Sequence, residues 1–461
     1  MEHTALETVP AELSGEPAVK PAALRTGPPR VVICGGGAGG LVLAIMLAHR
    51  SRGGRDFAVT LADPSPTHVW KPLLHEFASG SADPGAHETA YFALARWHGF
   101  KFAQGPLEGI DRERQEVLIG PARDETGAEL APARPLLYDR LVIAVGGVTN
   151  DFGVTGARDH AFALDSAADA ERLHRRIVQA CMRANYGLDD FPDQRLDICI
   201  VGGGATGVEL AAELRATTRE LIAYGLDRLD PETFIRISLI NADPRLLLQL
   251  PEHISTSVEK VLRDLNIDVQ NGQQVTEVTS DHVVMRSGKQ RQADITIWAA
   301  GVKAPAFLAG LGGLATNRMD QIEVTPTLLA TGDPHVFAIG DCASAPWLDR
   351  NVRVPPRAQA AYQEARYLAR AIPAALRGEA LKPFRYNDLG SLVSLGGESA
   401  VGTLMGWARG AGIRIEGLLA QLIYRWLYKQ HQAVLFGWWA VFLESIGGWF
   451  RSATRPHVKL H

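Results

Sequence analysis

Short apolar runs recur along the chain, and two of them are followed at once by clustered glycines. The first run, Val31–Cys34, precedes a glycine-rich turn and then a segment of helical composition from Leu41 to His49. A further apolar run, Ala58–Ala62, ends at Asp63. Short uninterrupted runs of this kind are typical of strands buried on both faces of a parallel sheet. The order strand, turn, helix, strand predicts a βαβ unit and an α/β fold.

The same order recurs later in the chain. A strand is predicted over Leu196–Val201, a helix over Val208–Leu221 and a strand over Phe234–Ile240. Three more buried strands are predicted, over Tyr138–Ala144, Thr296–Gly301 and His335–Ile339. The first two fit crossings between two domains, and the third returns the chain to the first domain. We therefore expect a discontinuous first domain of residues 30–154 and 321–400, with a second domain of residues 155–320 inserted in it.

Both glycine-rich turns carry the spacing G-x-G-x-x-G. The six glycines are Gly35, Gly37, Gly40, Gly202, Gly204 and Gly207. In this motif the first glycine closes a tight turn, the second lets a pyrophosphate approach the backbone, and the third packs helix on strand. Asp63 stands where an acid bonds the adenosine ribose, and Asp341 ends a later strand where a carboxylate can bond ribityl hydroxyls. Two such folds suit a flavin and a nicotinamide that meet face to face.

Composition excludes several other classes of protein. The chain has 461 residues, of which 46% are hydrophobic and 21% charged, as in a globular protein with a core. Its net charge of −4 gives no reason to expect nucleic acid as a partner. Its four cysteines include no C-x-x-C pair, so we expect neither a disulfide framework nor a metal site. Residues 1–29 are rich in proline and glutamate, and we interpret them as a disordered lead-in.

The C-terminal part of the chain differs from the rest. Residues 411–461 hold six basic and two acidic residues and four of the nine tryptophans. The spacing of Gln421, Arg425, Lys429 and Gln432 predicts one polar stripe on a helix. The longest apolar run, Ala433–Leu443, reaches only about 16 Å as a helix, against roughly 30 Å of hydrocarbon. We therefore expect residues 401–461 to form an amphipathic helical region, which binds the bilayer surface through residues 413–461.

These pieces together resemble one family, the type II NADH dehydrogenases, which are single-subunit NADH:quinone oxidoreductases of the two-dinucleotide-binding-domain flavoproteins. The resemblance covers about residues 30–461. The segments that carry it, besides the fingerprints, are His68–Glu76, Val208–Leu214, Ala358–Gln363, Gly390–Leu395 and Arg455–His461. Taken together, these motifs are specific to the family.

The resemblance implies a glutathione-reductase-like arrangement of two Rossmann-like domains, with FAD in the first and NADH in the second. The residues that it places at FAD are Gly35, Gly37, Gly40, Asp63, Lys71 and Asp341. Those that it places at NADH are Gly202, Gly204, Gly207, Asn241 and Gly301. The implied reaction passes a hydride from NADH to FAD and then two electrons to a membrane quinone such as ubiquinone. It occurs without proton pumping, on a peripheral protein at the cytoplasmic face of the inner membrane; a homodimer is left open.

The family resemblance implies a catalytic role for three side chains. By resemblance, Glu209 lies near the contact of flavin and nicotinamide, although the helix dipole alone would also favour an acid in a first turn. Gln359 and Gln363 are i and i+4 on one predicted helix and match the family's A-Q-x-x-x-Q quinone motif. Their amides can donate hydrogen bonds to a quinone carbonyl whose charge grows on reduction. Without the resemblance, two solvated glutamines would be the simpler interpretation.

The sequence departs from the family at two positions. Asn387 stands where many members have lysine, and Asn241 stands where the family usually has glutamate. Asn241 can bond a ribose hydroxyl but cannot repel a 2′-phosphate. Arg245 would attract that phosphate and Asp243 would repel it, so we expect NADH as the main donor with some tolerance of NADPH.

Three alternative functions remain open. A sulfide:quinone oxidoreductase would need a redox cysteine pair beside the flavin, and Cys181 and Cys199 are poorly spaced for it. Another NAD(P)H-dependent flavoprotein reductase would leave the tryptophan-rich tail without a role. A non-catalytic, redox-sensing flavoprotein scaffold is the third alternative.

Overall fold

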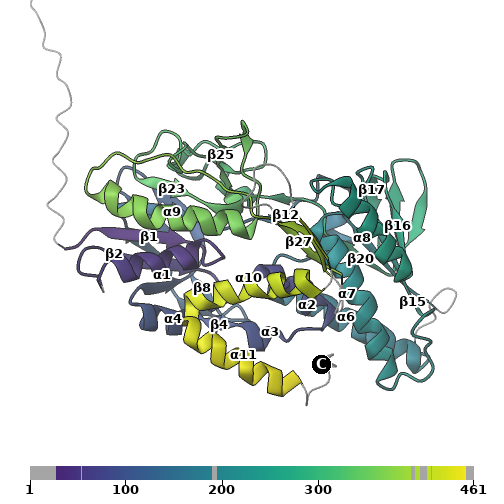
Figure 1. Cartoon of the computed structure of the whole chain (residues 1–461). Coiled ribbons are helices and arrows are strands. Elements are labelled where there is room, and N and C mark those ends of the chain that lie inside the picture. The colour runs from purple at the N-terminus through teal and green to yellow at the C-terminus, as the bar shows by residue number, and fades with distance from the viewer. Residues whose placement is uncertain are drawn as a thin grey trace, which may run out of the picture.

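The computed structural model describes residues 27–452, except residue 53 and residues 189–194, 396–399, 405–412 and 417. Most of the expected lead-in and the motif Arg455–His461 lie outside the described residues. Two five-stranded parallel sheets form the body of the molecule, the first built from the early strands and one late strand, the second from the middle of the chain (Figure 1). The predicted α/β fold with two dinucleotide-type domains is therefore confirmed.

The first sheet follows the predicted βαβ order. Its strands, in spatial order, are β23 (Val336–Ala338), β11 (Arg140–Ile143), β1 (Arg30–Cys34), β2 (Ala58–Asp63) and β5 (Lys101–Gln104). Helix α1 (Gly40–Arg50) follows β1 directly, and α9 (Ala358–Leu376) packs against α1 in the same apolar core. The strand order reverses between β1 and β11, and ligands of open parallel sheets bind at such a reversal.

The second sheet repeats this plan. Its strands, in spatial order, are β13 (Ala161–Ala163), β20 (Ile295–Trp298), β14 (Leu196–Val201), β15 (Ile235–Ile240) and β16 (Ile267–Gln270). The helices packed on it are α6 (Ala167–Asn185), α7 (Ala205–Ala223) and α8 (Glu252–Asp264). The short helix α2 (Leu74–Ser79) follows β2 in sequence but buries Leu74 and Phe77 in the core of the second sheet. The segment around Lys71 and His75 is therefore held at the junction of the two sheets.

The chain crosses between the sheets twice. The two crossings pair as β12 (Val148–Thr149) and β21 (Val302–Lys303). After β21, Leu308 and Leu311 already pack in the core of the first sheet. The chain thus returns before the boundary expected at residue 320, because these leucines form an apolar face that the strand pattern did not reveal.

The C-terminal region is not helical throughout, contrary to our expectation for residues 401–461. Strands β28 (Ala400–Leu404) and β29 (Ile413–Glu416) extend an antiparallel sheet that starts with β27 (Gly390–Ser394). The helices begin only at α10 (Leu418–Phe436), followed by α11 (Trp438–Ser452). The strands escaped the sequence interpretation because it rested on tryptophan and charge content rather than on the two-residue alternation of a strand.

Helix α10 lies against elements from the first half of the chain (Figure 1), and histidines take part in the contact. The Nε2 atoms of His68 and His431 lie 2.9 Å apart, and Nδ1 of His87 lies 2.9 Å from the Tyr428 hydroxyl. Several large apolar side chains on α10 and α11 are exposed instead: Trp426, Trp438, Trp439, Phe442 and Leu443. Within the part of the chain that the structure describes, no helix is both long and apolar enough to cross a bilayer.

Candidate active site

The first glycine fingerprint forms a turn in which two glycines are sterically required and one faces open space. A Cβ atom at Gly35 would lie 2.3 Å from the Ala144 carbonyl oxygen, and Gly35 has a φ of +105°. A Cβ at Gly40 would lie 1.8 Å from the Gly35 oxygen, whereas one at Gly37 would meet nothing within 4 Å. The open side at Gly37 is where the motif lets a pyrophosphate reach the backbone.

The second fingerprint has the same geometry. A Cβ at Gly202 would lie 2.7 Å from the backbone of Ala299, and one at Gly207 would lie 2.0 Å from the Gly202 oxygen. A Cβ at Gly204 would again meet nothing within 4 Å. The chain therefore contains two similar phosphate cradles, each followed by the N-terminus of a long helix.

Three charged side chains lie around the first cradle. Asp63 accepts hydrogen bonds from the backbone nitrogens of Gly36, at 2.6 Å, and Ser65, at 2.8 Å. Asp341 follows β23 on the other side of β1. Burial raises the pKa of both carboxyl groups, and the positive charge of Lys71 opposes that rise in each. The charge of Lys71 thus acts on both acids that the sequence placed at the flavin.

Asn241 holds a loop at the end of β15. Its side-chain nitrogen lies 3.1 and 3.0 Å from the carbonyl oxygens of Asp243 and Arg245, and 3.0 Å from the Asn271 side-chain oxygen. The guanidinium of Arg245 donates to the Ser255 hydroxyl and to the backbone of residues 247–248. The side chains of Asn241 and Arg245 therefore both form hydrogen bonds within the protein, whereas Asp243 is exposed.

The two folds open on one cleft of 1860 Å³. Among the residues predicted at ligands, the following line it: Gly35, Gly37, Asp63, Lys71, Glu209, Gly301 and Asp341. The second fingerprint contributes its helix start, Ala205 and Thr206. Sites for drug-sized ligands usually measure roughly 300–1,000 Å³, so this cleft has room for two large ligands.

Glu209 is the buried acid of this cleft. Its Oε1 accepts a hydrogen bond of 3.1 Å from the Ser394 nitrogen, and its Oε2 lies 3.8 Å from Nδ1 of His75. Burial raises the pKa of Glu209 to about 8, and the nearby Glu76 and Glu213 charges add to that rise. Burial also lowers the pKa of His75 to about 4, so His75 is uncharged at neutral pH. Since α7 begins at Ala205, Glu209 is in its second turn, and the dipole explanation of a first-turn acid does not apply.

The two glutamines face a chain segment rather than the cleft. Gln359 donates to the Gly390 oxygen at 2.9 Å and accepts from the Leu389 nitrogen at 3.1 Å. Gln363 makes the same pair of bonds, at 2.8 and 3.0 Å, with the backbone of Asn387. Neither side chain lines the cleft, whereas Ala358 and Ala361 on another face of α9 do. Both amides therefore hold residues 387–390, next to Leu392 of the cleft wall.

Two further residues were missed by the sequence interpretation. The Glu364 carboxylate is buried and accepts a hydrogen bond of 2.6 Å from the Gly340 nitrogen, beside Asp341. Burial raises the pKa of Glu364 to about 8. The sequence did carry a sign of this buried acid, because Glu364 shares the apolar face of α9 with Ala360, Ala361 and Leu368. The other is His75, which the chain brings to Glu209 from more than 130 positions away.

The cysteines offer no redox chemistry. Cys34, Cys181, Cys199 and Cys342 are all buried and unbridged. Burial raises the pKa of each thiol to about 12. Reactive cysteines need a lowered pKa and access, so these four are packing residues.

A cleft shared by two glycine-fingerprint folds, without a redox cysteine pair, defines an oxidoreductase with two dinucleotide-binding folds. Residues 29–365 match the model of the pyridine nucleotide-disulphide oxidoreductases. A type II NADH:quinone oxidoreductase of Haemophilus influenzae is 38% identical over 94% of this chain and 99% of its own length. One of Mycobacterium tuberculosis is 29% identical over 91% of this chain and 88% of its own. The chain therefore belongs to the pyridine nucleotide-disulphide oxidoreductases and, within them, to the type II NADH:quinone oxidoreductases.

Solved structures share the fold. NDH2 from Plasmodium falciparum, solved in complex with NADH, superposes with a TM-score of 0.76 at 21% identity, over 94% of this chain and all of that one. The sulfide:quinone oxidoreductase of Aquifex aeolicus superposes with a TM-score of 0.69 at 20% identity, over 89% and 92% of the two chains. At these identities the likeness concerns the fold alone.

Proposed function

We propose that this chain is an FAD-dependent NADH:quinone oxidoreductase, which transfers a hydride from NADH to FAD and then two electrons to a membrane quinone. The observation that carries the proposal is the 1860 Å³ cleft, which is lined by the first glycine cradle and by Ala205 and Thr206 at the start of the helix that follows the second. The family relationship supports the same reaction, since the relatives named above are NADH:quinone oxidoreductases. The buried, high-pKa thiols argue against sulfide oxidation.

The residues around the first cradle fit FAD. Gly37 leaves the backbone open to a pyrophosphate, Gly35 and Gly40 shape the turn, and Asp63 borders the adenosine side. Lys71 and Asp341 would lie along the ribityl and ring side, where Glu364 keeps the turn of Asp341 in place. The bound flavin would supply the two-electron chemistry, and the protein its orientation and surroundings. Around the second cradle, NADH would bind along Gly202, Gly204 and Gly207 and pass Gly301, with Asn241 shaping the adenosine end.

Glu209 would act at the contact of the two rings. With a pKa raised to about 8, it is mostly protonated at neutral pH, so its O–H can donate a hydrogen bond where a carboxylate could only accept one. Gln359 and Gln363 would act on the quinone side as positioning residues, because they fix residues 387–390 beside the cleft wall. A quinone would then approach past Leu392 rather than bond these amides directly.

The exposed aromatic surface of α10 and α11 fits a bilayer surface. Trp438 and Trp439 are 61% and 73% exposed, while the polar His431 and Gln432 are buried on the side that faces the protein. This inverted arrangement is typical of surfaces that meet a membrane or another apolar partner. We place the protein as a peripheral protein on the cytoplasmic face of the inner membrane. Trp438→Ser together with Trp439→Ser should reduce cosedimentation with lipid vesicles, and unchanged cosedimentation would place the membrane contact elsewhere.

Turnover of the purified protein tests the proposed reaction. We expect bound FAD and NADH oxidation that depends on a soluble ubiquinone analogue. In Gly204→Leu the larger side chain enters open space, so the fold and the FAD should remain while NADH oxidation becomes slower and needs more NADH. Oxidation of sulfide with quinone, or no NADH oxidation by the FAD-loaded wild type, would show that the assignment is wrong.

A further inference from the structure

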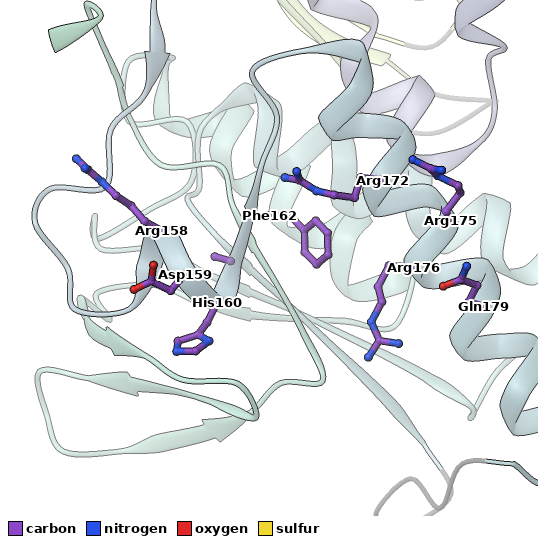
Figure 2. A pocket seen from close by; sticks show the side chains of 9 residues that line it. Arg158, Asp159, His160, Phe162, Arg172, Arg175, Arg176 and Gln179 are labelled. Atoms are coloured by element: carbon purple, nitrogen blue, oxygen red, sulfur yellow. The ribbon is translucent and has the colours of Figure 1, made fainter. Parts of the chain in front are cut away.

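A second cavity lies at the edge of the second sheet, away from the cleft. It measures 540 Å³ and is bordered by the short helix α5 (Ala157–His160), by β13 and by α6 (Figure 2). Strand β13 begins beside this cavity at Ala161, and the chain that leaves its other end lines the cleft at residues 164–168. The cavity and the cleft therefore lie at opposite ends of one strand.

The cavity is strongly basic. Arg172, Arg175 and Arg176 project from α6, and Arg158 of α5 also borders the cavity, with its guanidinium pointing away from those three (Figure 2). Asp159 is the one acid in the described lining. The chain as a whole has a net charge of −4, so this concentration of arginine is a local feature and does not reflect its composition.

Two of the arginines are already neutralised. Arg158 forms an ion pair with Asp151, and Arg172 pairs with Asp169 at 3.1 Å. Arg175 forms no hydrogen bond or ion pair with any residue that the structure describes. Arg176 is half-buried, and its positive charge partly opposes the rise that burial causes in the pKa of Asp294. Arg175 and Arg176 therefore keep donors available for a ligand.

The chemistry of the cavity selects an anion with adjacent charges. A guanidinium presents a rigid fork of donors that matches two oxygens of a phosphate, and charge-assisted bonds of this kind are the strong ones. Two such forks and the exposed imidazole of His160 exceed what a single carboxylate can satisfy. The half-buried Phe162 ring, with Arg172 5.6 Å from its centroid, supplies an apolar wall for an organic group. The volume lies within the roughly 300–1,000 Å³ of small-molecule sites.

We propose that this cavity binds a soluble organic polyphosphate, of the chemical class of the nucleoside di- and triphosphates, through Arg175, Arg176 and His160. The site is separate from the dinucleotide cleft and does not depend on the reaction proposed above. Arg175 is eight positions beyond Ala167, which lines the cleft, or about 12 Å along the same helix.

Calorimetric titration with tripolyphosphate tests the proposal, because this probe carries the phosphates without an adenosine that the cleft could recognise. The FAD-loaded protein is saturated with NAD⁺ and titrated at low salt, first with tripolyphosphate and then with ATP. We expect one site per chain for both probes. The double variant Arg175→Ala, Arg176→Ala should weaken the binding of both probes by about tenfold or more, since it removes two charge-assisted contacts. The control Arg286→Ala removes an exposed arginine of the same domain and should leave the affinity for both probes unchanged.

Several results would overturn the proposal. They are the absence of tripolyphosphate binding, equal weakening in the double variant and in Arg286→Ala, and binding that disappears when NAD⁺ is present. A second titration, with lipid vesicles, distinguishes binding of a lipid phosphate from binding of a soluble phosphate. If phosphatidylglycerol vesicles bind through Arg175 and Arg176 while tripolyphosphate does not, the soluble ligand is wrong. If the double variant melts at a lower temperature than the wild type, the single variant Arg175→Gln, at an exposed position, replaces it and should still weaken binding severalfold.

Discussion

Replacing Glu209 by glutamine removes a buried, titratable acid that lines the cleft beside the start of the second glycine fold. Glutamine keeps the size of the side chain and an oxygen that can accept the bond from the Ser394 nitrogen. It carries no charge at any pH, so Glu209→Gln imitates the protonated wild type. The two proteins should therefore behave alike where Glu209 is protonated and differ where it ionises.

The size of the difference follows from the pKa. Burial raises the pKa of Glu209 from 4.5 to about 8 in the folded protein, and one pKa unit corresponds to about 1.4 kcal/mol. An ionised Glu209 thus costs the fold about 5 kcal/mol, which is an upper value for a single group. The folded protein binds this proton more tightly than the unfolded chain does. The stability contribution is therefore complete below pH 4.5 and is lost as the pH rises through about 8.

Two measurements across pH 5–10 follow this proton. The melting temperature of Glu209→Gln should exceed that of the wild type by a margin that grows up to about pH 8 and then stays constant. The rate of flavin reduction by NADH should fall above about pH 8 in the wild type and remain flat in the variant. Glu220→Gln, a half-buried position on the same helix, is the matched control and should follow the wild type. Parallel pH curves for wild type and Glu209→Gln would refute the reasoning.

Three other predictions concern the cradle, the quinone side and the coenzyme. Gly204→Leu should raise the KM for NADH at least tenfold in a folded protein, whereas Gly207→Ala, whose Cβ would lie 2.0 Å from a backbone oxygen, should lower the soluble yield. Gln359→Ala loses two bonds to the backbone, worth about 1–3 kcal/mol, and should slow flavin reoxidation by quinone more than reduction by NADH in single-turnover assays. Asp243→Asn should raise kcat/KM for NADPH relative to NADH, while Asn241→Glu, which loses the donors that hold its loop, should chiefly lower the melting temperature.

The sequence was sufficient where local sterics decide the structure. The fingerprint glycines could be assigned because only glycine tolerates the turn at Gly35 and the close packing at Gly40. The buried strand Leu196–Val201 was predicted with the bounds that the structure shows. In both cases the cause lies within a few residues of its effect, so a local pattern reveals it.

Contacts between distant segments could not be predicted. The amide of Gln359 forms equally good bonds with a quinone or with a peptide group, and only the fold brings residues 387–390 to it. The same holds for Asn241, whose partners include Asn271, and for His75, which reaches Glu209 from another domain-forming segment. Helix α10 is docked through His68 and His431, which are separated by 363 positions. Such pairings depend on the complete fold.

The central claim is that one cleft performs two half-reactions in sequence, and anaerobic stopped-flow spectroscopy with two mixing steps tests it most directly. Mixing the FAD-loaded protein with one equivalent of NADH should bleach the oxidised flavin absorbance, and a second mixing with a ubiquinone analogue should restore it. Gly204→Leu should slow only the first phase, and Gln359→Ala chiefly the second. A flavin that NADH does not bleach, or a reduced flavin that the quinone does not reoxidise, would contradict the account.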